Sequence, residues 1–261
     1  MRQALIQKLS VHGGHVGPNL GMVEATIAMH YVFDSPKDKM VFDVSHQSYC
    51  HKMLTGRADA FLDEAKYDDV SGYSEPSESA HDFFCIGHTS TSVSLACGLA
   101  KARDLADENY NVIAVIGDGS LSGGEALEGL DFAKELNGNL IVVVNDNEMS
   151  IAENHGGLYE NLKLLRDTKG QAECNIFKAM GLNYVFVEDG NDLTQLIDAF
   201  KRVKDYKAPV AVHIHTLKGK GYTLAEENKE SWHWHMPFDI ETGKTKGNYD
   251  GGEDYGTLTA D

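Results

Sequence analysis

The sequence has no apolar run of the roughly 18–20 residues that a membrane-spanning helix requires. Basic residues are also scarce: 23 Lys and Arg stand against 40 Asp and Glu, which gives a net charge of −17. This charge repels the phosphates of nucleic acids and anionic membrane surfaces, so we expect neither as a partner. The N-terminus lacks the apolar core of a secretory signal peptide.

Cysteine is rare as well. The four cysteines, Cys50, Cys85, Cys97 and Cys174, are scattered and form no C-x-x-C motif. Their number and spacing argue against a disulfide framework and favour reduced thiols in a cytoplasmic protein. The remaining composition, with 42% hydrophobic and 24% charged residues, is ordinary for a globular protein with a sizeable core.

Apolar, strand-like runs alternate with helical patterns along most of the chain. Continuous Val- and Ile-rich strands between such helices predict an α/β fold, with an open, mostly parallel sheet covered by helices on both faces. We expect one domain over residues 1–240 and a Gly- and Asp-rich linker over 241–261, after which more chain should follow. Strands are predicted at 39–45, 83–87, 111–117, 139–145, 182–188 and 208–216, and helices at 18–33, 90–108, 122–136 and 192–206.

Polar side chains follow two of these strands. Asp118 lies between two glycines after the first strand, and the triplet Asn145-Asp146-Asn147 ends the next. In parallel sheets, ligands bind at the carboxyl ends of the strands, and a helix N-terminus there favours an anion such as a diphosphate. A carboxylate beside a diphosphate needs a cation between them, and Mg²⁺ prefers oxygen ligands. The spacing therefore predicts a magnesium–diphosphate site that uses Asp118, the amide of Asn147 and a backbone carbonyl after it.

Two other ligand classes are open at this point. A dinucleotide-binding turn would require a third glycine, but Ser122 occupies that position of Gly117-x-Gly119-x-x-Ser122. Zinc is suggested by the pairs His12/His15, His213/His215 and His233/His235, although no H-E-x-x-H motif or cysteine pair accompanies them. Several histidines are also useful in a cleft that moves protons between carbonyl and hydroxyl groups.

The two motifs "GDG" and "NDNEMSI" resemble the thiamine diphosphate motif of the transketolase superfamily, in the form found in the 1-deoxy-D-xylulose-5-phosphate synthase family. The segments "GGHVGPNLGMVEATIAMHYVF", "FDVSHQSYCHKMLTGR", "IGHTSTSVSLACGLA" and "HTLKGKGYTLAEENKESWH" extend this resemblance from about residue 10 to 239. The resemblance implies the thiamine diphosphate-binding fold, and thiamine diphosphate and Mg²⁺ as cofactors.

The resemblance also implies roles for individual residues. The magnesium ligands would be Asp118, the side chain of Asn147 and the backbone carbonyl of Met149. His15, His233 and His46 would act at the reacting centre, with His235 as a competitor for the role of His233. Contacts to the cofactor, or lining of its cleft, would come from His46, His51, Gly87, His88, Thr89, Gly119, Ser120, Asn147 and Tyr222.

The implied reaction is a two-carbon transfer from a keto donor to an aldehyde acceptor, with pyruvate and glyceraldehyde 3-phosphate as the expected pair. Ketol transfer between sugar phosphates is the alternative. An NAD-dependent oxidoreductase and a non-catalytic partner subunit are further possibilities. The family's pyrimidine-binding domain would follow the linker, so we expect a subunit of a split enzyme or a fragment, inactive alone and part of a homodimer or heterotetramer.

The chain departs from the family pattern in two places that the structure can test. The connection over residues 151–182 is shorter than in the family. The N-terminus is expected to lack the helix that usually precedes the "GGH" motif.

Overall fold

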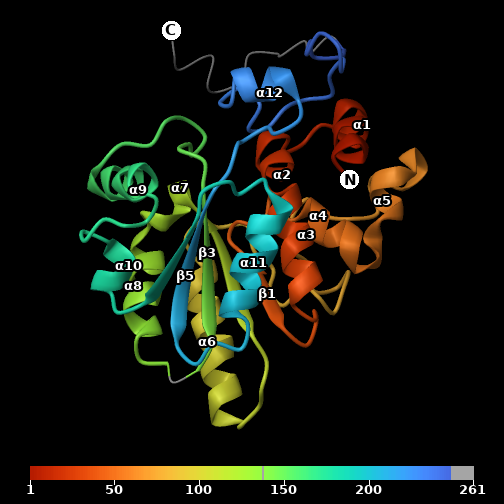
Figure 1. The fold of residues 1–261 in the computed structure, drawn as a ribbon. Coiled ribbons are helices and arrows are strands. Elements are labelled where there is room, and N and C mark those ends of the chain that lie inside the picture. The colour runs from red at the N-terminus through yellow and green to blue at the C-terminus, as the bar shows by residue number, and fades with distance from the viewer. Residues whose placement is uncertain (137, 248–261) are drawn as a thin grey trace, which may run out of the picture.

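The computed structural model describes residues 1–136 and 138–247 as an α/β domain built on a five-stranded sheet (Figure 1). All neighbouring strands are parallel, in the order β1-β2-β3-β5-β4. The predicted fold class is therefore confirmed. The strands are β1 (Lys39–Phe42), β2 (Val112–Gly117), β3 (Leu140–Asp146), β4 (Asn183–Val187) and β5 (Pro209–His215).

Helices cover both faces of the sheet (Figure 1). On one face α6 (Ser92–Leu105) and α8 (Gly124–Ala133) bury an apolar cluster against β2 and β3, and on the other α3 (Val23–Val32) and α11 (Leu193–Val203) bury a second. Because the central strands have neighbours on both sides and helices on both faces, all seven residues of β3 are buried. This double coverage explains why the strands are continuously apolar rather than alternating.

Helix α11 illustrates how local sequence fixes an element. Asp192 caps its first turn by accepting hydrogen bonds from the backbone N–H groups of Thr194 and Gln195, at 2.7 and 3.1 Å. Its buried residues then recur at helical spacing along one face that packs on the sheet. These residues are Leu196, Ala199, Phe200 and Val203.

A third apolar cluster joins the N-terminal segment to the region after β5. It packs α1 (Arg2–His12) and α2 (Gly17–Gly21) against the segment that contains Tyr222, Trp232 and Phe238. Figure 1 shows α1, α2 and α12 (Thr223–Glu227) side by side, away from the sheet's helical flanks. The expectation of a missing N-terminal helix is wrong, since α1 stands directly before the "GGH" motif.

Several predicted boundaries need correction. The predicted strand at 83–87 is not formed. Two of its backbone carbonyls accept serine hydroxyls instead: Ser74 Oγ donates to the carbonyl of Phe84, and Ser45 Oγ to that of Ile86. The predicted helix 18–33 is broken at Met22 into α2 and α3. The predicted helix 122–136 is shortened to α8 at Gly124–Ala133, and a separate short helix that was not predicted, α7 (Asp118–Leu121), precedes it.

The connection over 151–182, predicted only as polar, contains α9 (Gly157–Asp167) and α10 (Ile176–Ala179). Between β1 and α6 the chain forms a series of short helical turns. These turns are α4 (Tyr49–Lys52), a π-type turn over Met53–Arg57, α5 (Asp59–Leu62) and a 3-10 turn over Glu64–Lys66.

Residues 241–247, predicted as part of the linker, fold back on the domain. The backbones of Phe238 and Thr245 form an isolated bridge, and Lys246 Nζ donates to the carbonyl of Ser10 at 3.2 Å. The rest of the predicted linker lies outside the described residues. Within 1–136 and 138–247, the helices are all too short or too polar to cross a membrane.

Candidate active site

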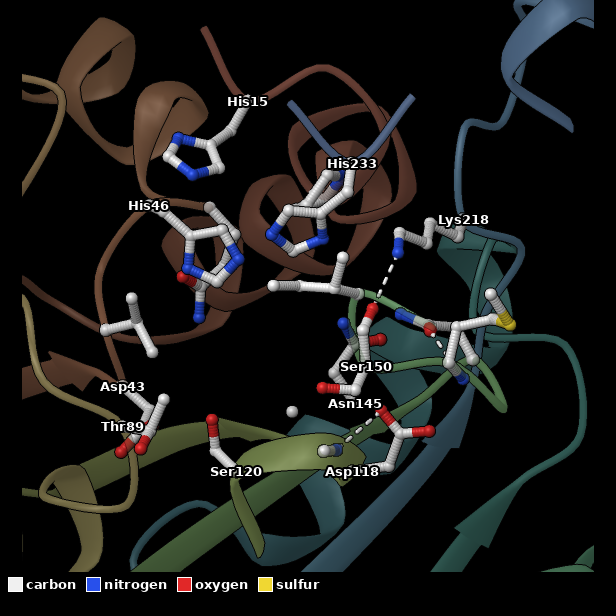
Figure 2. Close-up of a pocket in the computed structure, with 18 residues that line it drawn as sticks. His15, Asp43, His46, Thr89, Asp118, Ser120, Asn145, Ser150, Lys218 and His233 are labelled. Carbon is white, nitrogen blue, oxygen red and sulfur yellow. Dashed lines mark hydrogen bonds between the residues drawn. The ribbon is translucent and has the colours of Figure 1, made fainter. Parts of the chain in front are cut away.

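A cavity of about 280 Å³ opens at the carboxyl ends of β1, β2 and β3 (Figure 2). Segments far apart in sequence meet there, from the N-terminal region to the segment after β5. Its wall is formed by His15, Pro18, Asp43, Val44, His46, Gln47, Thr89, Gly117, Asp118, Gly119, Ser120, Asn145, Asn147, Met149, Ser150, Ile151, Lys218 and His233.

The turns that follow β2 and β3 form one wall. Gly117 and Asn145 are register partners, so the two turns start side by side. They approach so closely that a Cβ atom on Gly119 would lie 3.0 Å from Ser150 Cα, which requires glycine at this position. The predicted magnesium ligands Asp118, Asn147 and Met149 therefore meet at one cavity, as the spacing of the motifs indicated.

Two buried carboxylates lie at these strand ends, but their surroundings differ. Arg166 Nη1 and His213 Nε2 contact Asp146 Oδ2 at 2.5 and 2.8 Å. Burial opposes ionisation of Asp146, yet the hydrogen bonds and charges of these two partners outweigh it and lower its pKa to about 2. Asp146 is thus a paired structural acid.

Asp118 has no ion-pair partner among the described residues. Its Oδ1 accepts from the N–H of Gly119 and its Oδ2 from Asn154 Nδ2, both at 3.0 Å. Burial and the neighbouring charge of Asp146 raise its pKa well above the usual carboxyl value. A buried acid with only neutral donors is costly to ionise, and a bound cation would offset this cost.

These donors fit magnesium. One carboxylate, one amide oxygen and one backbone carbonyl are hard oxygen ligands, of the kind that Mg²⁺ shares with phosphate oxygens and water. By contrast, the part of the chain that the structure describes holds no group of three or more His, Cys, Asp or Glu side chains that could ligate a metal. The histidine pairs considered for zinc are not gathered into such a group.

Three histidines form the opposite wall of the cavity (Figure 2). The ring centroids of His15 and His46 are 4.8 Å apart, and those of His15 and His233 are 5.5 Å apart. Burial lowers the pKa of His15 and of His233 to about 4, and it also lowers the pKa of His46 well below its usual value. All three rings are neutral near pH 7, so each offers one N–H donor and one acceptor nitrogen.

Backbone contacts fix these histidines. The buried Asn19 donates from Nδ2 to the carbonyls of His15 and His46, both at 2.8 Å. Val44 and Ser45, just before His46, have φ values of 54° and 70°, which for a β-branched residue is a strained conformation. The turn after β1 therefore directs His46 to the cavity at a cost in backbone energy.

The structure distinguishes His233 from His235. His233 lines the cavity, whereas His235 stacks on Trp232 with ring centroids 4.3 Å apart. The backbones of His235 and Gly14 exchange two hydrogen bonds of 2.9 Å. This pairing attaches the segment of His233 to the "GGH" motif and brings His233 next to His15.

Sequence reasoning missed some lining residues, above all Lys218. Its buried side chain reaches the cavity and donates to the carbonyl of Ser150 at 2.7 Å (Figure 2). Burial lowers its pKa to about 8.

Asp43 is a second lining residue that the sequence analysis did not predict. Its carboxylate accepts hydrogen bonds from the N–H groups of Ser90 and Ser92 and so places the neighbouring Thr89 at the cavity.

Four predicted cofactor residues do not line the cavity. Gly87 and His88 are exposed beside Thr89. The prediction that His51 and Tyr222 line the cleft is wrong, because both rings serve the packing of the domain. His51 lies between His30 and Asp82, and the Tyr222 hydroxyl donates to the carbonyl of Ile240 at 2.9 Å.

Comparison with solved structures supports the fold. A transketolase from Campylobacter jejuni superposes with a TM-score of 0.68 at 21% identity, over 88% of this chain and 38% of that one. A transketolase mutant from Pichia stipitis gives a TM-score of 0.65 at 23% identity, over 86% and 36%. At these identities the likeness concerns the fold alone.

Sequence comparison is more specific. The chain is 42% identical to the 1-deoxy-D-xylulose-5-phosphate synthase of Caldanaerobacter subterraneus, over 95% of this chain and 46% of the relative. It is 45% identical to that of Listeria monocytogenes, over 93% and 41%. The chain thus spans less than half the length of these relatives. A family model described as 1-deoxy-D-xylulose-5-phosphate synthase matches residues 1–175 and 164–216. The chain belongs to the 1-deoxy-D-xylulose-5-phosphate synthase family.

Proposed function

We propose that this chain is the diphosphate-binding half of a thiamine diphosphate-dependent synthase that joins a two-carbon unit from pyruvate to glyceraldehyde 3-phosphate. The observation that carries the proposal is the cavity itself. It combines a buried carboxyl group without an ion-pair partner among the described residues, Asp118, with three neutral histidines on the facing wall.

The cation and diphosphate would occupy the wall formed by β2 and β3. Asp118, the amide oxygen of Asn147 and the carbonyl of Met149 would ligate Mg²⁺. Gly119, Ser120 and Thr89 would contact the diphosphate. Lys218, with a pKa of about 8, is protonated at neutral pH and would add a positive charge beside that anion.

The wall formed by His15, His46 and His233 would contact the reacting groups of the substrates. Bound thiamine diphosphate supplies a nucleophilic carbon and an electron sink for cleaving and forming carbon–carbon bonds. His15 and His233 are neutral near pH 7, so each can donate a hydrogen bond to a developing alkoxide and accept a proton when a hydroxyl becomes a carbonyl. His46 would hold the reacting group between them.

The proposed site is incomplete in this chain. Its relatives extend to more than twice the matched length, and a pyrimidine-binding domain, in a second polypeptide or in further sequence, would supply the rest. We propose that the 261-residue chain is inactive alone and works in a homodimer or heterotetramer with that domain.

Calorimetry with thiamine diphosphate, with and without Mg²⁺, tests the proposal. We expect binding that depends on Mg²⁺. Binding of NAD without metal dependence would indicate an oxidoreductase, and no binding of either would indicate a non-catalytic partner subunit. Steady turnover of pyruvate and glyceraldehyde 3-phosphate by the purified chain alone would contradict the proposed need for a second domain.

Ketol transfer between sugar phosphates has weaker support, because the transketolase structures match at 21–23% identity and so bear on the fold alone. An assay of the completed enzyme that compares pyruvate with ketose phosphates as donor separates the two reactions.

A further inference from the structure

One segment that the proposed function does not use contacts both strand-end turns. The chain from Asn154 through α9 makes a contact at each: Asn154 Nδ2 donates to Asp118 Oδ2 at 3.0 Å, and Arg166 Nη1 to Asp146 Oδ2 at 2.5 Å. The Tyr159 hydroxyl also lies 3.4 Å from the carbonyl of Gly119. The two matched pieces of the family model meet in this region, at residues 164–175.

The two acids receive chemically different donors from this segment. Arg166 is a cation, so it neutralises Asp146 and leaves little attraction for a metal ion. Asn154 is a neutral amide, so it orients Asp118 without cancelling its charge. A lysine or arginine at the position of Asn154 would compete with a metal for the same carboxylate.

The hydrogen bonds of Asp118 leave room for a ligand. An ionised carboxylate has about four acceptor sites on its two oxygens. The N–H of Gly119 uses one site on Oδ1, and Asn154 uses one on Oδ2. Each oxygen therefore retains acceptor capacity, and the carboxylate is held in one orientation from both sides.

We propose that Asn154 is a positioning residue of the cation site, which fixes the Asp118 carboxylate through a neutral hydrogen bond and so prepares it for Mg²⁺. This inference rests on the proposed function, because it presupposes that Asp118 is a magnesium ligand. In this view the chain from Asn154 through α9 makes the two neighbouring acids different: Arg166 makes Asp146 a structural carboxylate, and Asn154 leaves Asp118 able to bind the metal.

The test uses the full chain with Mn²⁺ alone as a paramagnetic probe, and Mg²⁺ with thiamine diphosphate in calorimetry. We expect Asn154→Ala to weaken Mn²⁺ and magnesium–cofactor binding about tenfold, the usual value of one hydrogen bond to a charged group. The melting temperature without metal should stay near that of the wild type. Asn154→Lys should abolish Mn²⁺ binding, since its ammonium group would pair with Asp118.

His155→Ala is the matched control, because His155 is the exposed neighbour of Asn154 and should bind Mn²⁺ like the wild type. Wild-type Mn²⁺ affinity in Asn154→Ala would overturn the inference. So would an equal loss of affinity in Asn154→Ala and His155→Ala, which would show only that the loop is perturbed. If Asp118→Asn also retains wild-type Mn²⁺ binding, the proposed cation site itself is wrong, which distinguishes the two failures.

Discussion

Asp118 and Asp146 lie at the ends of neighbouring strands, and only Asp146 has a cationic partner among the described residues, Arg166 at 2.5 Å. Both side chains are almost completely buried. The fold thus places two acids together and neutralises one of them. Asp118 is left without an ion-pair partner in the described part of the chain, so a bound cation would offset the cost of ionising it, and it lies at the wall where the family motifs predict Mg²⁺.

Replacing Asp118 with Asn should abolish metal-dependent binding of thiamine diphosphate, with a loss of at least about a hundredfold for removing a charged ligand. The same change should raise the melting temperature of the metal-free chain by a few degrees, because a buried and uncompensated carboxylate is removed. Calorimetry and thermal unfolding measure the two effects. Unchanged cofactor affinity would refute the ligand assignment.

Replacing Asp146 with Asn should destabilise the chain by about 3 kcal/mol, because Arg166 would lose its buried partner. Urea unfolding measures this change. The control lies on α9, the helix that carries Arg166: Asp167→Asn breaks the exposed pair with Lys163 and should cost less than about 0.5 kcal/mol. Equal effects of the two variants would contradict the structural role of Asp146.

The histidine wall predicts a pH dependence of stability. His15 and His233 titrate near pH 4 in the folded chain, against 6.5 when unfolded. As the pH falls from about 6.5 to 4, the unfolded chain takes up protons that the folded chain does not, so the free energy of unfolding falls. Each ring lowers the free energy of unfolding by at most about 1.4 kcal/mol per pH unit. The actual contribution is smaller because both rings keep some contact with water.

Urea unfolding of the wild type and of a His15→Gln, His233→Gln double variant at pH 7.5 and 5.5 measures this dependence. The double variant should lose less stability than the wild type between these two pH values. An equal loss in both proteins would show that the two rings already titrate normally in the folded chain.

Lys218 predicts a pH dependence of cofactor affinity. Its ammonium group is charged at pH 7 and loses its proton above about pH 8. Affinity for magnesium–thiamine diphosphate should therefore fall as the pH rises through 8, and Lys218→Met should weaken it about tenfold at pH 7 and remove this fall. Calorimetry from pH 6.5 to 9 tests both, with the exposed Lys220→Met as control. A wild-type pH profile in Lys218→Met would contradict the role.

Local sequence predicted the elements that lie in the centre of the sheet. The runs that became β2 and β3 are apolar up to their carboxyl ends because both faces of the sheet are covered, and this pattern can be read from the local sequence. The segment at 83–87 has a similar composition but forms no strand, and the hydroxyls of Ser45 and Ser74 donate to two of its carbonyls. Those serines are distant in sequence, so local composition could not reveal these hydrogen bonds.

The candidate active site also has parts that the local sequence predicts and parts that depend on contacts between distant segments. The sequence by itself determined the parts that depend on local spacing, which are the glycine turn around Asp118 and the amide of Asn147, 29 residues further along the chain. The histidines were indicated by the resemblance to the family motifs. Only the tertiary structure decided which groups reach the cavity. In the folded chain His233 lines the cavity, whereas His235 stacks on Trp232. Lys218 is buried and donates to Ser150. Asp146 pairs with the cationic Arg166, whereas Asp118 accepts a hydrogen bond from the neutral Asn154. The reason is that charge compensation and burial depend on side chains from separate segments, which meet only when the sheet and its helices are packed.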